Sequence, residues 1–490
     1  SGTATTAQAN ALAAATSGIV TATIAEGDLT TLAGLTGTGN AYSITIDDAS
    51  VDAAALNTLD EKTTVVIDAS ATITLSGTST EINTAFTSPG ISGLRDQDVI
   101  LSDISLTASV LNALDDNTTG SIDASSITAL TGSATDLIEA VTSNGITGLG
   151  DEAITVDSGT ATTAQANALA DETSGIVTAT IAEGDLATLS GLTGTGNAYA
   201  ITISDTAVNA AILNAINNKT INDINGQNII QIEGTAEDIA TAYTAGGING
   251  LGDEEIIFTA SNINASDLIA IDSANSQVID ASTLTTLTGT AVDLNTAFES
   301  GGISNLGDED VTLTDTSLTT SVLNALDDNT TGSIDASTLN TLSGAAVDLN
   351  TAFDSGGISN LSDQDVTLTD SSLTASVLNA LDGNTTGSID ASAVTTLTGT
   401  AVDLNTAFDS GGISNLSDQD VTLTDTSLTA SVLNALDDNT TGSIDASTLN
   451  TLTGAAVDLN TAFDSGYKGQ PSDLHSSSPR RSADLPQCPR

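Results

Sequence analysis

The sequence is dominated by a repeat of 55 residues, and this repeat limits the folds that the chain can adopt. The string L-[ST]-G-x-A-V-D-L-N-T-A-F begins at Leu287, Leu342, Leu397 and Leu452, always 55 residues apart. Weaker copies begin at Leu75, Leu130 and Ile232, and residues 1–47 and 158–204 are near copies of a shorter unit. A unit this short cannot bury its apolar side chains alone, so we expect the copies to stack around one continuous core.

Each 55-residue unit divides again into two coils. The string VTLTD ends at Asp315 and Asp370, and the string SID ends at Asp335 and Asp390. The spacing between these acidic residues alternates between 20 and 35 residues. Short runs of β-branched residues that end in a turn residue are typical of strands. We therefore expect one short strand in each coil. The longer half also contains AVTTLTG, for which a second short strand and a turn are the two alternatives.

The segments between these strands have the spacing of short helices. Leu373, Val377 and Leu381 recur every four residues, which places them on one face of a helix. Thr374 is a plausible N-cap, and the string Thr400-x-x-Asp403 has the form of a capping box. Each coil is therefore predicted to contain a strand, a turn, a short helix and a second turn.

These units predict an α/β solenoid, in which stacked right-handed coils of strand, turn and short helix form a parallel β-sheet. The alternative is a β-solenoid in which the helical segments are extended corners. Residues 1–466 are expected to form one elongated domain. Residues 467–490 hold four of the seven basic residues, four of the five prolines and the only His and Cys. They are predicted to be a disordered tail that is foreign to the repeat.

Large side chains gather at one position of the repeat, the last residue of the string that the leading Leu or Ile begins. Aromatics make up only 2% of the chain, which makes this position conspicuous. The residues found there are Phe86, Val141, Tyr243, Phe298, Phe353, Phe408 and Phe463. We interpret them as a ladder of stacked core side chains.

The charge of the chain excludes several classes of function. With 63 acidic and 7 basic residues, the net charge is −56. Nucleic acids and anionic membrane surfaces are excluded as partners, because binding them requires clustered Lys and Arg. No run of 18 apolar residues is present, so no membrane span is expected. Residues 1–466 contain no His and no Cys, and repeated identical sites do not suit an enzyme, so no catalytic activity is expected.

The acidic loops are the one chemical signal in the repeat. The string DDNTTGSID at residues 327–335 matches the first part of a calcium-binding loop, although Thr338 stands where a bidentate Glu would be needed. The candidate calcium ligands are Asp115, Asn117, Asp123, Asp327, Asn329, Asp335, Asp382, Asn384, Asp390, Asp437, Asn439 and Asp445. The alternative is a purely structural turn between a helix and a strand.

A second argument concerns the ends of neighbouring strands. If the strands stack in register, Asp315 and Asp335 would belong to a file of carboxylates that a divalent cation would neutralise. The alternative is that each Asp caps the turn that follows it.

The strings VTLTDTSLTASVLNALDDNTTGSIDAS and LTGTAVDLNTAF resemble the repeats of very large bacterial surface and extracellular proteins of adhesin-like type, which occur in marine cyanobacteria and other bacteria. The resemblance covers residues 1–466. It implies export, a location at the cell surface or in the extracellular matrix, and a scaffold role that often involves calcium. It supplies no catalytic residues.

Two functions follow as expectations. The first is a non-enzymatic structural role, as a rod or filament that associates end to end or continues into further repeats of a longer chain. The second is an adhesin or calcium-binding module, whose repeated Asp-rich edge or face holds a cation, a glycan or another surface ligand.

Overall fold

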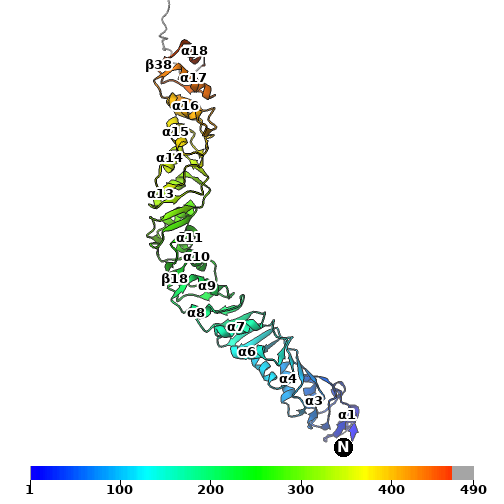
Figure 1. Cartoon of the computed structure of the whole chain (residues 1–490). Helices are drawn as coiled ribbons and strands as arrows, with labels where there is room; N and C mark the ends of the chain where they lie inside the picture. The colour runs from blue at the N-terminus through cyan, green and yellow to red at the C-terminus, as the bar shows by residue number, and fades with distance from the viewer. Residues whose placement is uncertain (1, 466–490) are drawn as a thin grey trace, which may run out of the picture. The chain divides into compact units, whose positions relative to one another are not determined.

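The computed structural model describes residues 2–465 as successive coils of parallel strands and short helices (Figure 1). The predicted tail at 467–490 lies outside the described residues. The described residues divide into two compact units, of which the first contains residues 2–234 and 241–255 and the second contains residues 235–240 and 256–465. Each unit consists of strand–helix coils stacked in sequence order, and this confirms the predicted α/β solenoid fold.

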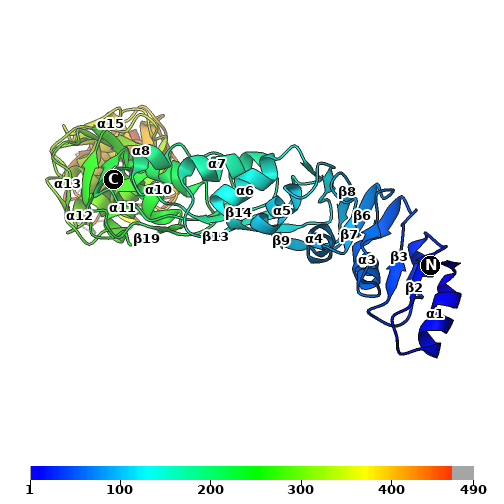
Figure 2. The same cartoon turned by 90° about the horizontal axis from the view of Figure 1, so that it is seen from below.

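The helices are short and occur once in most coils. Their bounds are α1 Thr6–Ala15, α2 Leu29–Leu32, α3 Ala53–Asp60, α4 Ser79–Thr87, α5 Ala108–Asp115, α6 Ala134–Thr142, α7 Thr163–Glu172, α8 Leu186–Leu189, α9 Ala210–Asn217, α10 Ala236–Thr244, α11 Ala265–Ala274, α12 Ala291–Glu299, α13 Thr320–Asn329, α14 Ala346–Asp354, α15 Ala375–Asn384, α16 Ala401–Asp409, α17 Ala430–Asn439 and α18 Ala456–Asp464. Successive helices such as α6 and α7 lie side by side (Figure 1 and Figure 2). Within residues 2–465, none of the helices has the length and apolar character needed to cross a bilayer.

The strands are also short, and the bounds of those before residue 256 include β1 Thr3–Ala4, β2 Thr21–Ile24, β3 Ala41–Ser43, β4 Ser50–Asp52, β5 Ile67–Asp68, β6 Thr74–Gly77, β7 Ile91–Ser92, β8 Asp98–Leu101, β9 Ser105–Thr107, β10 Ile122–Asp123, β11 Ala129–Ser133, β12 Ile146–Thr147, β13 Ala153–Ser158, β14 Val177–Thr180, β15 Ala198–Ala200, β16 Ala207–Asn209, β17 Ile224–Asn225, β18 Gln231–Gly234 and β19 Ile248–Asn249. The later strands are β20 Glu255–Phe258, β21 Asn262–Asn264, β22 Ile279–Asp280, β23 Thr286–Gly289, β24 Ile303–Ser304, β25 Asp310–Leu313, β26 Ser317–Thr319, β27 Ile334–Asp335, β28 Thr341–Gly344, β29 Ile358–Ser359, β30 Asp365–Leu368, β31 Ser372–Thr374, β32 Ile389–Asp390, β33 Thr396–Gly399, β34 Ile413–Ser414, β35 Asp420–Leu423, β36 Ser427–Thr429, β37 Ile444–Asp445 and β38 Thr451–Thr453.

The expectation of one strand per coil is wrong, because each complete repeat of the second half contributes five strands. In addition to DVTL and ID, the segments SLT, TLTG or TLSG, and IS also pair with neighbouring coils, as β26, β28 and β29 do. The TLTG segment is the second short strand that was one of two alternatives for the longer half, whereas SLT and IS are too short to be recognised as strands on their own. They become strands because the preceding or following coil has an extended segment directly beside them, with which their backbone N–H and C=O groups form hydrogen bonds.

The sheets of the second unit are staggered along the stack. Each strand pairs with the strand two places later in the chain, as in Leu342 opposite Val366 and Val366 opposite Ile389. Two such pairing steps, from Leu342 to Ile389, cover fewer residues than one 55-residue repeat. Each strand that is added to a sheet therefore comes from an earlier point of the repeat, and its position relative to the helices shifts from coil to coil. The sheet β26-β28-β30-β32-β34 ends at Ile413–Ser414, because the next pairing step would fall inside α17. New sheets begin at equivalent strands of successive repeats, which are β21, β26, β31 and β36.

The core is thin and is made of small and branched aliphatic side chains. In α16, Ala401, Leu404 and Ala407 are fully buried and point toward the strands. Thr400 is the N-cap of this helix, and its side chain accepts a hydrogen bond from the N–H of Asp403. The predicted capping box is only half formed, because Asp403 Oδ2 accepts from Thr400 Oγ1 instead of from the N–H of Thr400. Hydrophobic burial on one face of a short helix therefore holds each coil to its sheet.

The predicted apolar face of the other helix is shifted in the structure. In α15 the buried residues are Ala375, Leu378 and Leu381, while Leu373 belongs to the preceding strand β31. Thr374 is the N-cap residue as expected, but its side chain makes no capping hydrogen bond. The difference arises because an extra strand occupies the residues that the helical spacing had included.

The large side chains at the end of the repeat string do not form a core ladder. Phe408 and its equivalents are half-buried, and Phe463 is 40% exposed. In α16 the adjacent residue Ala407 is the one that faces the strands, and a helix turns by about 100° per residue, so Phe408 lies at the edge of the buried face. The small Ala side chain is buried because the space between helix and sheet is narrow.

This arrangement predicts the relative cost of truncating two neighbouring side chains. Leu404→Ala should lower the free energy of unfolding of the second unit by about 2–5 kcal/mol, because it leaves a cavity in a closed core. Phe408→Ala should cost clearly less, since its neighbours and solvent can close the space. Urea denaturation followed by circular dichroism measures both, with the exposed Val402→Ala as the control. An equal cost for the Leu and Phe variants would contradict the edge position of Phe408.

Candidate functional site

In many coils, the acidic residue that follows a strand or bridge caps a helix in the preceding coil. Asp425 Oδ2 accepts a hydrogen bond from the N–H of Ala401, the first residue of α16, at 2.7 Å. The same contact is made by Asp48 to Leu29, Asp103 to Ser79, Asp205 to Leu186, Asp315 to Ala291 and Asp370 to Ala346. The first N–H groups of a helix have no partner within the helix. The strand-end carboxylate of one coil therefore completes the helix of another coil.

The structure overturns one interpretation of the strand-end acids and divides the other. Strand pairing places Thr312 opposite Asp335, so Asp315 lies beyond the register of Asp335 and the two carboxylates do not form a file. The predicted file is wrong because the step along the chain from Asp315 to Asp335 is shorter than the pairing step from Thr312 to Asp335. The predicted turn cap is wrong for Asp315, which caps α12 in the preceding coil. It is confirmed for Asp335, which accepts a hydrogen bond from the N–H of Ser337 in the turn that follows it.

The DDNTTGSID loop is a turn built around a buried threonine. Thr330 Oγ1 donates to the carbonyl of Glu309 at 2.8 Å and accepts from the N–H of Gly332 at 2.9 Å. A side chain at position 332 would collide with that same carbonyl, so only glycine fits there. Asp327 accepts from Ser355 Oγ at 2.7 Å, whereas Asn329 donates to Asn295 Oδ1 at 2.8 Å. The first two candidate ligands therefore contact different coils.

The third candidate ligand of each loop bonds the coil that follows. Asp335 Oδ1 accepts from Asn360 Nδ2 at 2.7 Å and from the N–H of Ser337 at 3.0 Å. These two hydrogen bonds hold the pKa of Asp335 below its usual value. The pKa values of Asp280 and Asp390 are lowered in the same way, by Asn305 and Asn415 respectively.

The other predicted ligands have equivalent surroundings. Asp115 and Asp382 accept from Ser143 and Ser410, Asn117, Asn384 and Asn439 donate to Asn83, Asn350 and Asn405, and Asp123 and Asp445 accept from Ser125 and Ser447. Burial raises the pKa of Asp437, with a contribution from Asp438. Among residues 2–465, no three His, Cys, Asp or Glu side chains lie together as a metal-holding group. Calcium binding by these loops stays a prediction.

The sequence did not reveal a buried polar position just before the long strand of the 55-residue repeat. The position holds Gln in Gln97, Gln364 and Gln419, and Glu in Glu152, Glu254 and Glu309. All six side chains are at most 3% exposed. Charged and amide side chains are rarely buried to this extent unless their polar atoms are bonded.

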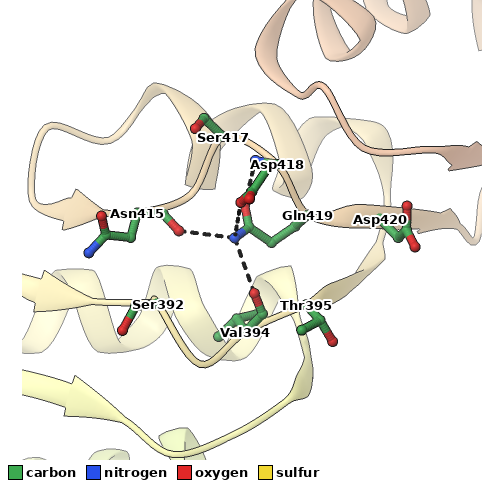
Figure 3. Close-up of a pocket in the computed structure, with 8 residues that line it drawn as sticks. All are labelled: Ser392, Val394, Thr395, Asn415, Ser417, Asp418, Gln419 and Asp420. Atoms are coloured by element: carbon green, nitrogen blue, oxygen red, sulfur yellow. Dashed lines mark hydrogen bonds between the residues drawn. The ribbon is translucent and has the colours of Figure 1, made fainter.

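In the Gln copies, one amide group joins three oxygen atoms. Gln419 Nε2 donates to the carbonyl of Val394 at 3.1 Å, to the carbonyl of Asn415 at 2.9 Å and to Asp418 Oδ1 at 3.1 Å (Figure 3). Its Oε1 accepts from the N–H of Asp418 at 3.1 Å. The amide therefore ties the loop to the preceding coil through Val394.

In the Glu copies, a glycine two residues earlier changes the loop. Glu152 Oε2 accepts from the N–H of Gly150 at 2.6 Å and from the N–H of Asp151 at 3.1 Å. The same pair of donors serves Glu254 and Glu309. The three glycines, Gly150, Gly252 and Gly307, have φ values of +140°, +144° and +150°, whereas the Gln copies carry Arg95, Ser362 and Ser417 there. A positive φ favours glycine. In this conformation the N–H of the glycine donates to the Glu carboxylate, so the glycine and the Glu occur in the same copies.

An open pocket lies beside the last of these loops in the second unit. It has a volume of about 560 Å³, and its lining residues include Ser392, Thr395, Asn415, Ser417, Asp418 and Asp420 (Figure 3). The lining offers hydroxyl, amide and carboxylate groups, which suit hydrogen bonding to a polar ligand. It includes no basic residue and no pairing of a nucleophile with a His or Cys.

Comparisons with known proteins assign no family to this chain. No protein-family model matches the sequence, and no curated protein matches it. The function is therefore inferred from the contacts between coils and from the resemblance of the repeats.

The helix-capping contact predicts a measurable loss of stability. Asp425→Ala removes the acceptor for the N–H of Ala401 and should lower the free energy of unfolding by about 0.5–2 kcal/mol, the range for loss of a helix cap. Asp425→Asn keeps an acceptor oxygen and should cost less. Thermal or urea unfolding compares them with Asp438→Ala, an exposed acid in the same repeat. Equal stability of Asp425→Ala and Asp438→Ala would show that the cap contributes nothing.

The lowered pKa values predict acid sensitivity. A carboxyl group whose pKa is lowered by folding contributes stability above its unfolded pKa of about 3.9, and this stability disappears as the pH falls through the folded value. The triple variant Asp280→Asn, Asp335→Asn, Asp390→Asn should therefore lose less stability than the native chain between pH 5 and pH 2.5. Urea midpoints across this range measure the slopes, with Asp328→Asn as the control. Parallel slopes for the native chain and the triple variant would refute the role of these carboxylates.

Proposed function

We propose that the protein is a non-enzymatic structural repeat protein that forms a scaffold or spacer at a bacterial surface or in an extracellular matrix. The observation that carries this proposal is the repeated use of Asp425 and its equivalents to cap the helix of the preceding coil. Asp425, Asp335 and their equivalents, which are the acids that recur in the repeat, are engaged in holding coils together. The location follows from the resemblance of the repeats to bacterial surface proteins.

Repetition of one contact set supports a scaffold more than an enzyme. An enzyme needs one distinctive cleft with an acid, a base or a nucleophile held in a defined geometry. Here the same hydrogen bonds recur, for example from Asn360 to Asp335 and from Asn415 to Asp390. Length can be added by repeating a unit without designing a new contact, which is the advantage of a solenoid as a spacer. Continuation into further repeats and end-to-end association use this same property.

The alternative is an adhesin or calcium-binding module. The polar pocket beside Gln419 favours it, because hydroxyl, amide and carboxylate groups are the ones that bind glycans and calcium. A glycan array and a calcium titration of the intact chain distinguish this function from a pure spacer. Binding that is lost on Asp418→Ala, with the fold retained, would favour the adhesin.

The spacer proposal predicts that repeat units can be removed one at a time. Deleting residues 345–399 joins Gly344 to Thr400 and restores the repeat string, and deleting residues 345–454 removes a second unit. Both shortened chains should keep the circular dichroism spectrum per residue of the native chain. Their maximum dimension, measured by small-angle X-ray scattering, should fall by equal steps. Loss of the fold on removal of a single unit would contradict a spacer built from interchangeable units.

Self-association is measured separately. Sedimentation velocity over a concentration series, with calcium and with a chelator, should show larger species as the concentration rises. A single monomeric species under every condition would reject end-to-end association, while the spacer role of the single chain would still be judged by the deletions.

A further inference from the structure

We propose that the loop around Glu152 is a site for a divalent cation, with Ca²⁺ as the best match, and that the sequence L-G-D-E marks such sites in this chain. The site is distinct from the DDNTTGSID loops, and the scaffold proposal does not depend on it. It lies at the buried position that holds Gln in other copies of the repeat.

The Gln copies show what surrounds this position. Gln364 Nε2 donates to the carbonyl of Leu339 at 3.1 Å, to the carbonyl of Asn360 at 3.1 Å and to Asp363 Oδ1 at 3.0 Å. Three oxygen atoms from the preceding coil and from the loop itself thus converge on one nitrogen. The site is complete only when an electropositive group occupies that point.

In the Glu copy, an oxygen replaces this nitrogen. Glu152 Oε2 accepts from the N–H of Asp151, just as Gln364 Oε1 accepts from the N–H of Asp363. The other carboxylate atom, Oε1, therefore takes the place of the amide nitrogen. Glu152 is fully buried, and its Oε1 has no hydrogen-bond partner among residues 2–465. Leaving a buried carboxylate oxygen without a partner is costly, so the position calls for a counter-charge.

The repeat supplies the remaining ligands. The residues equivalent to the acceptors around Gln97, which are Thr72, Gly93 and Asp96, are Ile127, Gly148 and Asp151. Two main-chain carbonyls and two carboxylates give four oxygen ligands with a charge of −2, which balances a divalent ion. This set has only two carboxylates, so it differs from a cluster of three acidic side chains. Ca²⁺ binds six to eight oxygen atoms in flexible geometry, and water completes its shell.

The accompanying glycine provides the space. At Gly150 the nearest atom to an added side chain would be a carbonyl oxygen 3.9 Å away, and at Gly307 nothing lies within 4 Å. The Gln copies have Arg95, Ser362 or Ser417 at this position. The glycine thus gives the carboxylate a second N–H donor and also leaves room for water beside the loop. Glu309 accepts from the same two N–H donors.

The test exchanges the two forms of the loop in the full-length chain. The double variant Gly150→Ser, Glu152→Gln converts the site to the sequence of a Gln copy, which the fold already accommodates. Isothermal titration with CaCl₂ should show one Ca²⁺ fewer per chain than the native protein. The reverse variant Ser362→Gly, Gln364→Glu should bind one Ca²⁺ more. Glu139→Gln, which removes an exposed negative charge from α6, should leave the number unchanged.

A local signal checks the assignment independently. Tyr243 Oη donates to Glu254 Oε2 at 2.7 Å, so Tb³⁺ bound at the L-G-D-E loop of Glu254 should luminesce when tyrosine is excited. Gly252→Ser with Glu254→Gln should abolish that luminescence, and Ca²⁺ should displace the Tb³⁺.

Two results would overturn the proposal. One is an unchanged number of bound Ca²⁺ ions in both the loss and gain variants, with thermal unfolding that is identical in calcium and in a chelator. The other is a stability difference between native chain and double variant that follows pH alone, which would mean that a proton occupies the position. Neither result bears on the deletion experiments, so the scaffold proposal would stand or fall separately.

Discussion

The first N–H groups of a helix need acceptors, and this need determines where the acidic residues of the chain must lie. A helix such as α16 is only nine residues long, so its unpaired terminal groups are a large share of its backbone. Thr400 and Asp425 supply the acceptors, and the second of these belongs to the next coil. A coil is therefore completed by its neighbour in polar contacts as well as in apolar burial. This mutual dependence is the nearest-neighbour coupling expected of solenoids.

The same contacts explain how the chain tolerates a net charge of −56 with so few basic residues. The carboxylates are bonded by peptide N–H groups, by hydroxyl groups and by side-chain amides, as Asp335 is by Ser337 and Asn360. These donors carry partial positive charge and are fixed by the backbone. They stabilise the ionised form, which is why folding lowers the pKa of Asp335. In this chain, hydrogen bonds from neutral groups stabilise the carboxylates, whereas in proteins of balanced charge Lys and Arg side chains also do so.

The fold class could be predicted from the sequence, because repeat length, helical spacing and the Thr400–Asp403 cap are local signals. The strand register could not, since segments as short as Ile358–Ser359 become strands only when a neighbouring coil pairs with them. Burial of Phe408 was overestimated, because its size suggested a core residue while the narrow interior accepts Ala407. The buried Gln419 was missed because polar residues in a turn usually face water. The sequence signal for this position is that Gly always stands two residues before Glu, whereas Ser or Arg stands two residues before Gln.

The link between Gly150 and Glu152 restricts the order in which one form of the loop can change into the other. A glycine can adopt the backbone conformation of either form, so replacing Ser362 by glycine first would leave the Gln contacts possible. Replacing Gln364 by Glu first would bury a carboxylate that lacks its second N–H donor. A stepwise exchange of one loop sequence for the other therefore costs less stability through the intermediate L-G-D-Q than through L-S-D-E. Related chains that diverged by repeat duplication should retain the first intermediate and lack the second.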